Sequence, residues 1–354
     1  MRNWDSFANN DIAGNPTIKD DTCPQEQDYL DALAVANHLD LPLQRVDFIE
    51  EYWDNVFKTF LSEYEKGRTP NPDILCNKYI KFDSFFEYAM KQGFDKVATG
   101  HYASNAEENG FTYLTRAKDQ NKDQTYFLCQ VEKSKIAKTI FPLAHLEKPE
   151  IRQIAAELNL ESVATKKDST GICFIGERNF RQFLSNYLPS KDGDIVDVNT
   201  GKVIARHVGV LYYTIGQRKG LNIDHEKGPW FVVGKDVVKN ILYVCRTDQR
   251  DLLYSDSCIV KGINWILPSL EEIPTKCTCK FRYRQKDQDI EIERLDDTSV
   301  LVKYPQTIAS VTEGQEAVFY DGDKCIGGGV IEEVFKDGKN LNQLIMETAN
   351  GYRG

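Results

Sequence analysis

The sequence predicts the α/β plus β fold class: a parallel-sheet domain, a small helical domain and an antiparallel β-barrel-like region. Amphipathic helical stripes alternate with strand-like runs over the first third of the chain. Two more helical stripes flank a glycine-containing segment, and short alternating runs separated by turn signals fill the remainder. We therefore expect domains at residues 1–139, 140–189 and 190–354.

In the first domain, apolar residues recur every three or four positions, which predicts three helices. These stripes cover residues 32–39, 53–61 and 82–90. Strand-like runs at 44–48 and 95–103 lie between and after them, an order that indicates a parallel sheet. Ligands bind beyond the carboxyl ends of such strands, so we expect Thr99, Gly100 and His101 at a ligand-facing edge.

In the second domain, Pro149 stands where a helix would begin, with a stripe at 151–158 behind it, and another stripe covers 180–187. The third region contains short alternating runs, which predict antiparallel strands. Examples are residues 230–233, 241–244, 278–284 and 317–320. The tail after about residue 334 is polar, and we expect it to be loosely held.

Composition excludes several classes of protein. No apolar run approaches the roughly 18 residues of a membrane span, and the first residues do not form a secretory signal. Nine irregularly spaced cysteines fit reduced thiols rather than a disulfide framework. Cys277 and Cys279 lack a second ligand pair, so we expect no metal site. The net charge of −10 argues against general nucleic-acid coating but leaves room for a local basic groove.

Cys76 is the first candidate for chemistry. The run GRTPNPDILCN at 67–77 presents this thiol beside a predicted helix start, which favours the thiolate. Prolines stiffen the approach, and Asp73 is near enough in sequence for proton transfer. A buried structural cysteine is the competing interpretation. Cys173, in the run STGIC, is a weaker candidate with the same alternative.

The run KCTCKFRYRQK at 276–286 is a candidate for RNA contact. It holds five basic residues, no acidic residue, and the aromatic side chains of Phe281 and Tyr283. Basic groups with stackable rings on a small β-domain suit RNA. Strand alternation would put Arg282 and Arg284 on one face. A solvated edge strand protected by charge explains the same pattern.

Together, these motifs resemble the tRNA-specific 2-thiouridylases, in order, from Met1 to about Glu333. The matching runs are MRNW (1–4), YWDNVF (52–57), GRTPNPDILCNKYIKF (67–82), ATGHYA (98–103), KDQTYFL (122–128), KDSTGICFIGERNFRQFL (167–184), YTIGQRKGL (213–221), FRYRQ (281–285) and GQEAVFY (314–320). The resemblance implies an adenine nucleotide α-hydrolase-like (PP-loop) domain at the start. It also implies that ATP, with Mg²⁺, activates the 2-oxygen of the wobble uridine as an adenylate, which persulfide sulfur then displaces.

The resemblance also assigns residues to roles. It implies that Cys173 carries the persulfide, that Cys76 is the second thiol, and that a transient Cys76–Cys173 disulfide follows. Asp73 would assist catalysis. The residues implied to contact tRNA are Asn71, Pro72, Asp73, His101, Lys122, Asp123, Gln124, Arg282, Tyr283 and Gln315. Met1 and Gly100 would line the ATP site, and a cysteine desulfurase system would supply the sulfur.

One departure concerns the start of the chain. Members of this family carry a strand, an SGGVDS-type phosphate loop, a helix and a second strand ahead of MRNW, and this sequence begins at MRNW. We expect the PP-loop domain to be partial, ATP binding to be impaired, and Met1 to be an internal methionine of a longer protein.

The leading interpretation is therefore a bacterial-type cytoplasmic, monomeric tRNA 2-thiouridylase; a mitochondrial location stays open. One alternative is a non-catalytic tRNA-binding paralogue, which would need neither Cys76 nor Cys173. Another is a thiol sulfur carrier that works without ATP and does not modify tRNA.

Overall fold

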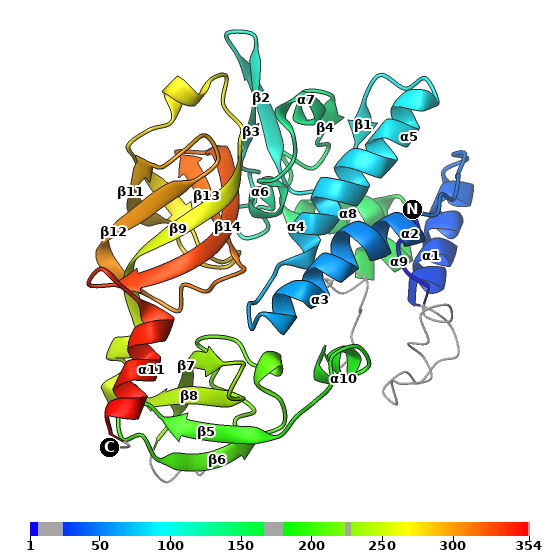
Figure 1. Cartoon of the computed structure of the whole chain (residues 1–354). Helices are drawn as coiled ribbons and strands as arrows, with labels where there is room; N and C mark the ends of the chain where they lie inside the picture. Colours follow the sequence, from blue (N-terminus) through cyan, green and yellow to red (C-terminus); the bar gives the residue numbers. More distant parts are fainter. Residues whose placement is uncertain (6–23, 166–179, 224–227, 353–354) are drawn as a thin grey trace. The chain divides into compact units, whose positions relative to one another are not determined.

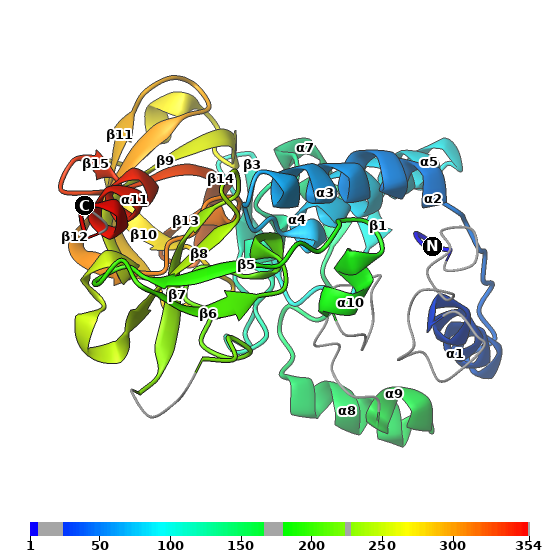
Figure 2. The same cartoon turned by 60° about the horizontal axis from the view of Figure 1, so that its bottom comes forward.

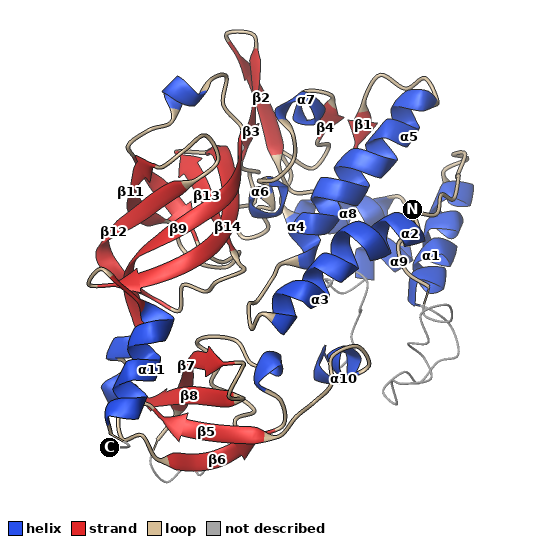
Figure 3. Ribbon diagram, viewed as in Figure 1, coloured by secondary structure: helices blue, strands red, loops and turns tan. Residues whose placement is uncertain are grey.

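The computed structural model describes residues 1–5, 24–165, 180–223 and 228–352 (Figure 1). The chain divides into two compact units. Unit 1 comprises Met1–Thr59, Pro72–Tyr187 and Asp323–Ile326, and unit 2 comprises Phe60–Asn71, Leu188–Gly322 and Gly327–Gly354. Helices predominate in the first and strands in the second, as Figure 3 shows.

The three helical stripes predicted near the N-terminus are confirmed. The corresponding elements are α1 (Pro24–His38), α2 (Ile49–Tyr52), a π-helical segment (Trp53–Phe57), α3 (Lys58–Glu65), α4 (Pro72–Cys76), a second π-helical segment (Asn77–Ser84) and α5 (Phe85–Lys91). Helix α1 stands by itself. The segments from α2 to α3 form one continuous helix, 49–65, and those from α4 to α5 form another, 72–91. Among the helices of the described ranges, none has the length and apolar character to cross a bilayer.

The parallel sheet of unit 1 is small. Strand β1 (Val97–Ala98) pairs in parallel with β4 (Thr139–Ile140). The run predicted as a strand at 44–48 instead makes one parallel bridge, between Asp47 and Arg2. An apolar run locates a strand-like segment, but the neighbouring chain decides how many ladder bonds it makes.

Unit 1 contains seven further named elements and an aromatic cluster. These elements are β2 (Ser104–Glu108), β3 (Phe111–Thr115), α6 (Thr125–Leu128), α7 (Lys133–Ile136), α8 (Lys148–Glu157), α9 (Glu161–Thr165) and α10 (Phe180–Ser185). The predicted helix at 151–158 is α8, whose start has a capping box between Glu147 and Glu150. In the cluster, the ring centroid of Trp4 lies 4.9 Å from that of Phe57 and 6.0 Å from that of Phe183 on α10.

Unit 2 contains a four-stranded sheet in the order β6-β5-β8-β7, visible in Figures 1 and 2. Its strands are β5 (Gly193–Asp197), β6 (Val203–His207), β7 (Trp230–Asp236) and β8 (Ile241–Arg246). Buried Ile195, Val232, Leu242 and Val244 form its core with residues of the 210–223 segment. The prediction of β structure from residue 190 is thus correct, and this sheet precedes the barrel.

The barrel has six antiparallel strands in the order β13-β10-β11-β12-β9-β14, closed by pairing of β13 with β14. The strands are β9 (Tyr254–Trp265), β10 (Lys276–Lys280), β11 (Gln288–Arg294), β12 (Val300–Ala309), β13 (Glu316–Asp321) and β14 (Lys324–Lys336). The first residues of β14, Lys324 and Cys325, belong to unit 1, where they pair with β3.

The prediction of a loosely held tail is wrong. Strand β14 continues to Lys336, β15 (Lys339–Asn340) pairs with it, and α11 (Leu341–Gly351) follows. Leu341, Ile345 and Ala349 are buried at intervals of four, because α11 lies on β7. A Cβ atom on Gly234 of β7 would come within 2.9 Å of Ile345, so only glycine leaves room for the helix.

Candidate functional site

Cys76 lies at the end of α4, one turn into the continuous helix that starts at Pro72. Proline suits the first helical position because its missing N–H would have no partner there. The thiol is 1% exposed, and the side-chain amide of Asn3 donates to Cys76 Sγ over 3.8 Å. The predicted partner of Cys76, Cys173, lies outside the described residues, so their pairing stays a prediction.

The helix that carries Cys76 is fixed against the segment of α6. The Asn77 side-chain amide donates to the Phe127 carbonyl over 2.9 Å, and Lys78 Nζ donates to Gln130 Oε1 over 3.1 Å. Asn77 is 1% exposed, and its Oδ1 has no hydrogen-bond partner among the described residues. A buried amide oxygen of this kind is a costly feature that functional sites often retain.

His101 adjoins the same helix. The ring of His101 lies 5.8 Å from that of Phe82, and its Nδ1 is 2.7 Å from Thr99 Oγ1. Burial, with a smaller effect of Lys81, lowers the pKa of His101 to about 3, so the imidazole is neutral at physiological pH.

Gln124 joins that run to the strand end. Its backbone N–H donates to the Tyr102 carbonyl over 2.7 Å, and its Oε1 accepts from the Tyr102 N–H over 2.9 Å. Buried Asp123 accepts from the Ala117 N–H and from Thr125 Oγ1. The structure therefore joins His101 to the helix of Cys76 through Phe82 and joins Gln124 to Tyr102, and it gives Asp123 a role in holding the loop.

The other predicted residues of unit 1 differ in exposure. Met1 and Gly100 are exposed, Asp73 and Lys122 are half-buried, and Pro72 is buried. Gly100 follows β1, at the strand end where the sequence places a ligand. Their contacts with tRNA or ATP stay predictions.

Arg282 lies in a turn of unit 2, because β10 ends at Lys280. The expected strand alternation of Arg282 and Arg284 is therefore wrong: residues 281–285 close back, with the Gln285 N–H bonded to the Arg282 carbonyl. The Arg282 guanidinium donates to the carbonyls of Ile215 and Ser310 and to Thr312 Oγ1. These bonds hold the 213–221 loop, while exposed Arg284 is open to solvent.

Gln315 and Tyr283 are half-buried in the same unit. Gln315 Nε2 donates to the Thr69 carbonyl over 2.5 Å, and this residue was predicted to contact tRNA. Asn71, at the end of the Phe60–Asn71 segment of unit 2, is half-buried.

The cysteines of unit 2 have a different environment. Burial raises the pKa of Cys245 and of Cys277 to about 12, and it raises those of Cys258 and Cys279 as well. Such thiols stay protonated and inert. Over the described ranges, no three His, Cys, Asp or Glu side chains are grouped so as to hold a metal ion.

The sequence interpretation missed two side chains of this site, Asn3 and Asn77. Both lie inside quoted motifs, MRNW and PNPDILCN, and Asn77 is the immediate neighbour of Cys76. An asparagine directly after a candidate thiol was the sequence signal that could have found Asn77. Asn3 is 73 positions away from Cys76, so only the fold reveals their contact.

The fold and site define a HUP-domain protein with two β modules and a buried, amide-bonded thiol. Family models agree along the chain: the tRNA methyl transferase HUP domain matches residues 1–177, the tRNA methyl transferase PRC-barrel domain matches 181–246, and the aminomethyltransferase beta-barrel domain matches 255–331.

Curated relatives named tRNA-specific 2-thiouridylase MnmA are similar over nearly the whole length. The protein of Mycoplasma capricolum is 56% identical over 95% of this chain and 91% of its own length. That of Mesoplasma florum is 54% identical over 94% of this chain and 91% of its own length. That of Bacillus cytotoxicus is 48% identical over 97% of this chain and 90% of its own length. The chain belongs to the tRNA-specific 2-thiouridylase family, which confirms the resemblance drawn from its motifs.

Proposed function

We propose that this chain transfers sulfur to C2 of the wobble uridine of tRNA. The observation that carries the proposal is the buried Cys76 thiol, bonded by the Asn3 amide, on a helix whose Phe82 packs on His101 and whose Asn77 bonds the Phe127 carbonyl. Asn71, Pro72 and Asp73 precede it on a stiff backbone and would hold the extruded base. The family to which the chain belongs supports this assignment.

In this proposal the two thiols work in sequence. Cys173 carries a persulfide, and the Cys76 thiolate attacks the Cys173 sulfur. The sulfur–sulfur bond of the persulfide breaks, and its outer sulfur, released as hydrosulfide, forms a bond to C2 of the base. The C2–O bond breaks in turn, and the 2-oxygen would leave with AMP if ATP had first activated it as an adenylate. A Cys76–Cys173 disulfide forms, and an external thiol reductant must supply two electrons to restore both thiols. Asp73 assists by holding or moving a proton beside the base.

The position of α10 supports the pairing of these thiols. Trp4 packs against Phe183 of α10, and the adjacent Asn3 bonds Cys76. Phe180, the first residue of α10, lies seven positions after Cys173, and an extended chain of that length spans at most about 25 Å.

ATP fits the described residues only in part. Around Gly100 nothing lies within 4 Å of an added Cβ, so a ligand has room to approach this strand end. Phosphate binding needs a glycine turn that leads from a strand into a helix. Of the described strands of the parallel sheet, β1 leads through Gly100 to His101 and then to β2, and β4 is followed by Phe141. We derive no step through ATP or Mg²⁺ from these residues.

The partners follow from the chemistry. We propose that tRNA docks on exposed basic side chains such as Arg218, Lys219, Arg284 and Lys286. A cysteine desulfurase system would load Cys173, and the chain would act as a cytoplasmic monomer.

The test uses purified full chain, tRNA, ATP, Mg²⁺ and a persulfide donor. Cys76→Ser and Cys173→Ser should each abolish 2-thiouridine formation, measured by mass spectrometry of digested tRNA, while tRNA binding persists. Cys245→Ser is the matched control and should retain activity. Activity in either mutant removes the two-thiol mechanism. A wild-type chain that accepts persulfide sulfur but never modifies tRNA would be a sulfur carrier, and one that only binds tRNA would be a non-catalytic paralogue.

A further inference from the structure

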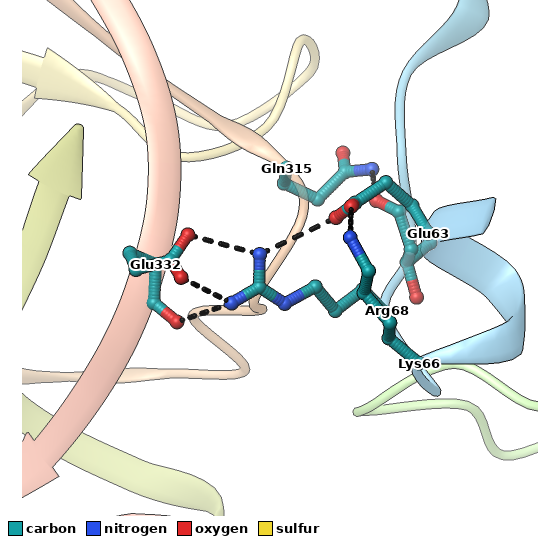
Figure 4. A network of polar contacts seen from close by, with 6 residues as sticks. Glu63, Lys66, Arg68, Gln315 and Glu332 are labelled. Atoms are coloured by element: carbon teal, nitrogen blue, oxygen red, sulfur yellow. Dashed lines mark hydrogen bonds and ion pairs between the residues drawn. The ribbon is translucent and has the colours of Figure 1, made fainter. Parts of the chain in front are cut away.

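The segment that leads to Asn71 and Cys76 is anchored by charged side chains of unit 2. Arg68 lies between two carboxylates: Arg68 Nη2 is 2.7 Å from Glu332 Oε1, and Arg68 Nη1 is 2.9 Å from Glu332 Oε2 and 3.3 Å from Glu63 Oε2 (Figure 4). Nη2 also donates to the Glu332 carbonyl over 3.2 Å. The Arg68 side chain is only 18% exposed. A two-pronged, partly buried arginine–carboxylate pair fixes direction as well as distance.

The backbone of Thr69 is held at both of its polar groups. Its N–H donates to the Glu313 carbonyl over 3.0 Å, and its carbonyl accepts from Gln315 Nε2 over 2.5 Å. Gly314, between these two residues, has a φ of +90°, and a Cβ there would approach Thr69 N to 2.9 Å. The 313–315 turn therefore touches residues 68–69 at backbone distance.

The helix before this segment ends in a way that directs it. Gly67 has a φ of +80°, its N–H bonds the Tyr64 carbonyl, and the Arg68 N–H bonds the Glu63 carbonyl. This is a Schellman termination of α3, with glycine in the left-handed position. A Cβ on Gly67 would come within 2.6 Å of Val237 Cγ2.

Two prolines restrict the backbone between Thr69 and α4. Pro70 and Pro72 are buried and each fixes φ near −65°, so few torsions are free between Thr69 and α4. The division between the units falls at Asn71 and Pro72. The chain thus enters the Cys76 helix directly from a clamped segment.

We infer that Arg68, Glu332 and Gln315 are positioning residues for Asn71–Asp73 and Cys76. They act through the backbone of residues 68–69. The inference rests on the proposed function of Cys76. It also assigns Gln315 a role inside the protein, where the family resemblance implied a tRNA contact.

The test compares variants of the full chain in the thiolation assay. Arg68→Ala, Glu332→Gln and Gln315→Leu should each lower kcat about 10- to 100-fold, with KM for tRNA changed less than about 3-fold, because the base and the thiol lose their fixed geometry. Arg68→Lys keeps the charge but loses the two-pronged guanidinium pair, and its kcat should lie between those of Arg68→Ala and wild type. The exchanged pair Arg68→Glu with Glu332→Arg should recover part of the loss of either single reversal.

Lys66→Ala is the matched control. Lys66 pairs with Glu63 in the same cluster, over 2.6 Å, but its side chain is 58% exposed. Its removal should leave kcat within about 2-fold of wild type, as for most exposed pairs. Folding of every variant is checked by its thermal midpoint.

A second readout does not depend on thiolation. Alkylation of Cys76, followed by peptide mass spectrometry, should be at least about 10-fold faster in Arg68→Ala than in wild type or Lys66→Ala, because a loosened helix start exposes a buried thiol. An unchanged alkylation rate in a folded Arg68→Ala variant overturns the inference, whether or not the chain thiolates tRNA. A change confined to KM and its salt dependence would make Gln315 a tRNA contact and would equally overturn its positioning role. Absence of thiolation in wild type, with Cys76 alkylation still controlled by Arg68, would reject the proposed function alone.

Discussion

Cys76 of unit 1 and Lys235 of unit 2 are both buried, yet their surroundings are opposite. Cys76 receives a hydrogen bond from Asn3, next to an asparagine whose carbonyl oxygen is unsatisfied among the described residues. Lys235 Nζ, on β7, has no hydrogen-bond partner in the part of the chain that is described. Burial lowers the pKa of Lys235 to about 7, against a smaller effect of Glu313. Burial alone therefore does not make a reactive group a candidate site; polar groups directed at it are the additional criterion.

The largest effect should come from removing Lys235. A lysine that binds its proton more weakly in the folded state makes the unfolded chain bind more protons between about pH 7 and pH 10.5, so stability rises with pH across that window and is lost as pH falls towards 7. Lys235→Met should raise the free energy of unfolding near pH 7 by roughly 3–5 kcal/mol. The substitution should also flatten the rise of the free energy of unfolding between about pH 7 and pH 10.5.

Denaturant unfolding at pH 6.5, 8 and 9.5 measures this, with Lys239→Met as the control. Lys239 is 61% exposed and makes only a long contact of 3.9 Å with Asp236. A Lys235→Met variant that is less stable than wild type would mean that the ammonium has a partner, and the contrast with Cys76 would fail.

The next effect concerns the amide at Cys76. Asn3→Leu removes the donor, and a hydrogen bond to a charged group contributes about 1.5–3 kcal/mol. If Cys76 reacts as a thiolate, thiolation should fall roughly 10- to 100-fold, and the pH at which Cys76 is half-alkylated should rise.

Asn3→Asp tests the same contact with nearly the same shape, because a carboxylate cannot donate to sulfur and repels a thiolate. It should be at least as damaging as Asn3→Leu. Equal activity of both variants and wild type would place Cys76 among the inert buried thiols.

The smallest effect should come from Arg282, whose surroundings are intermediate between those of Cys76 and Lys235. It is a half-buried charge with acceptors, but these belong to the protein. Arg282→Ala should lower the free energy of unfolding by roughly 1.5 kcal/mol, weaken tRNA binding and flatten the dependence of affinity on salt. Arg284→Ala removes an exposed charge of the proposed docking surface, so it should weaken tRNA binding and flatten the salt dependence while leaving the free energy of unfolding unchanged. Unchanged tRNA affinity in Arg282→Ala would put the docking surface elsewhere.

Local patterns predicted the helices well. The stripes at 53–61 and 82–90, the proline start at Pro149 and the turn-rich region from residue 190 all appear in the structure. Each depends on neighbours within four positions, which sequence periodicity captures. The α11 helix was missed because its apolar stripe is short and lies in a polar tail, and the groove that it fills on β7 is made by a distant glycine.

The site was only partly predictable. Motifs located Cys76, His101 and residues 122–124, but the contacts that organise them join positions far apart. Asn3 bonds Cys76, Asn77 bonds residue 127, and Arg68 bonds Glu332 across 264 positions. Spacing along the chain contains no information about such pairs, so the acceptors of Arg282 and Gln315 could not be inferred.

The aromatic cluster at α10 has a practical consequence. Trp4 and Trp53, with ring centroids 6.0 Å apart, belong to unit 1, and the chain's other two tryptophans, Trp230 and Trp265, belong to unit 2. Replacing the latter pair by phenylalanine would leave ultraviolet emission from the indoles near α10 alone. The intrinsic tryptophan fluorescence of the protein would then report movements of that helix without an attached dye.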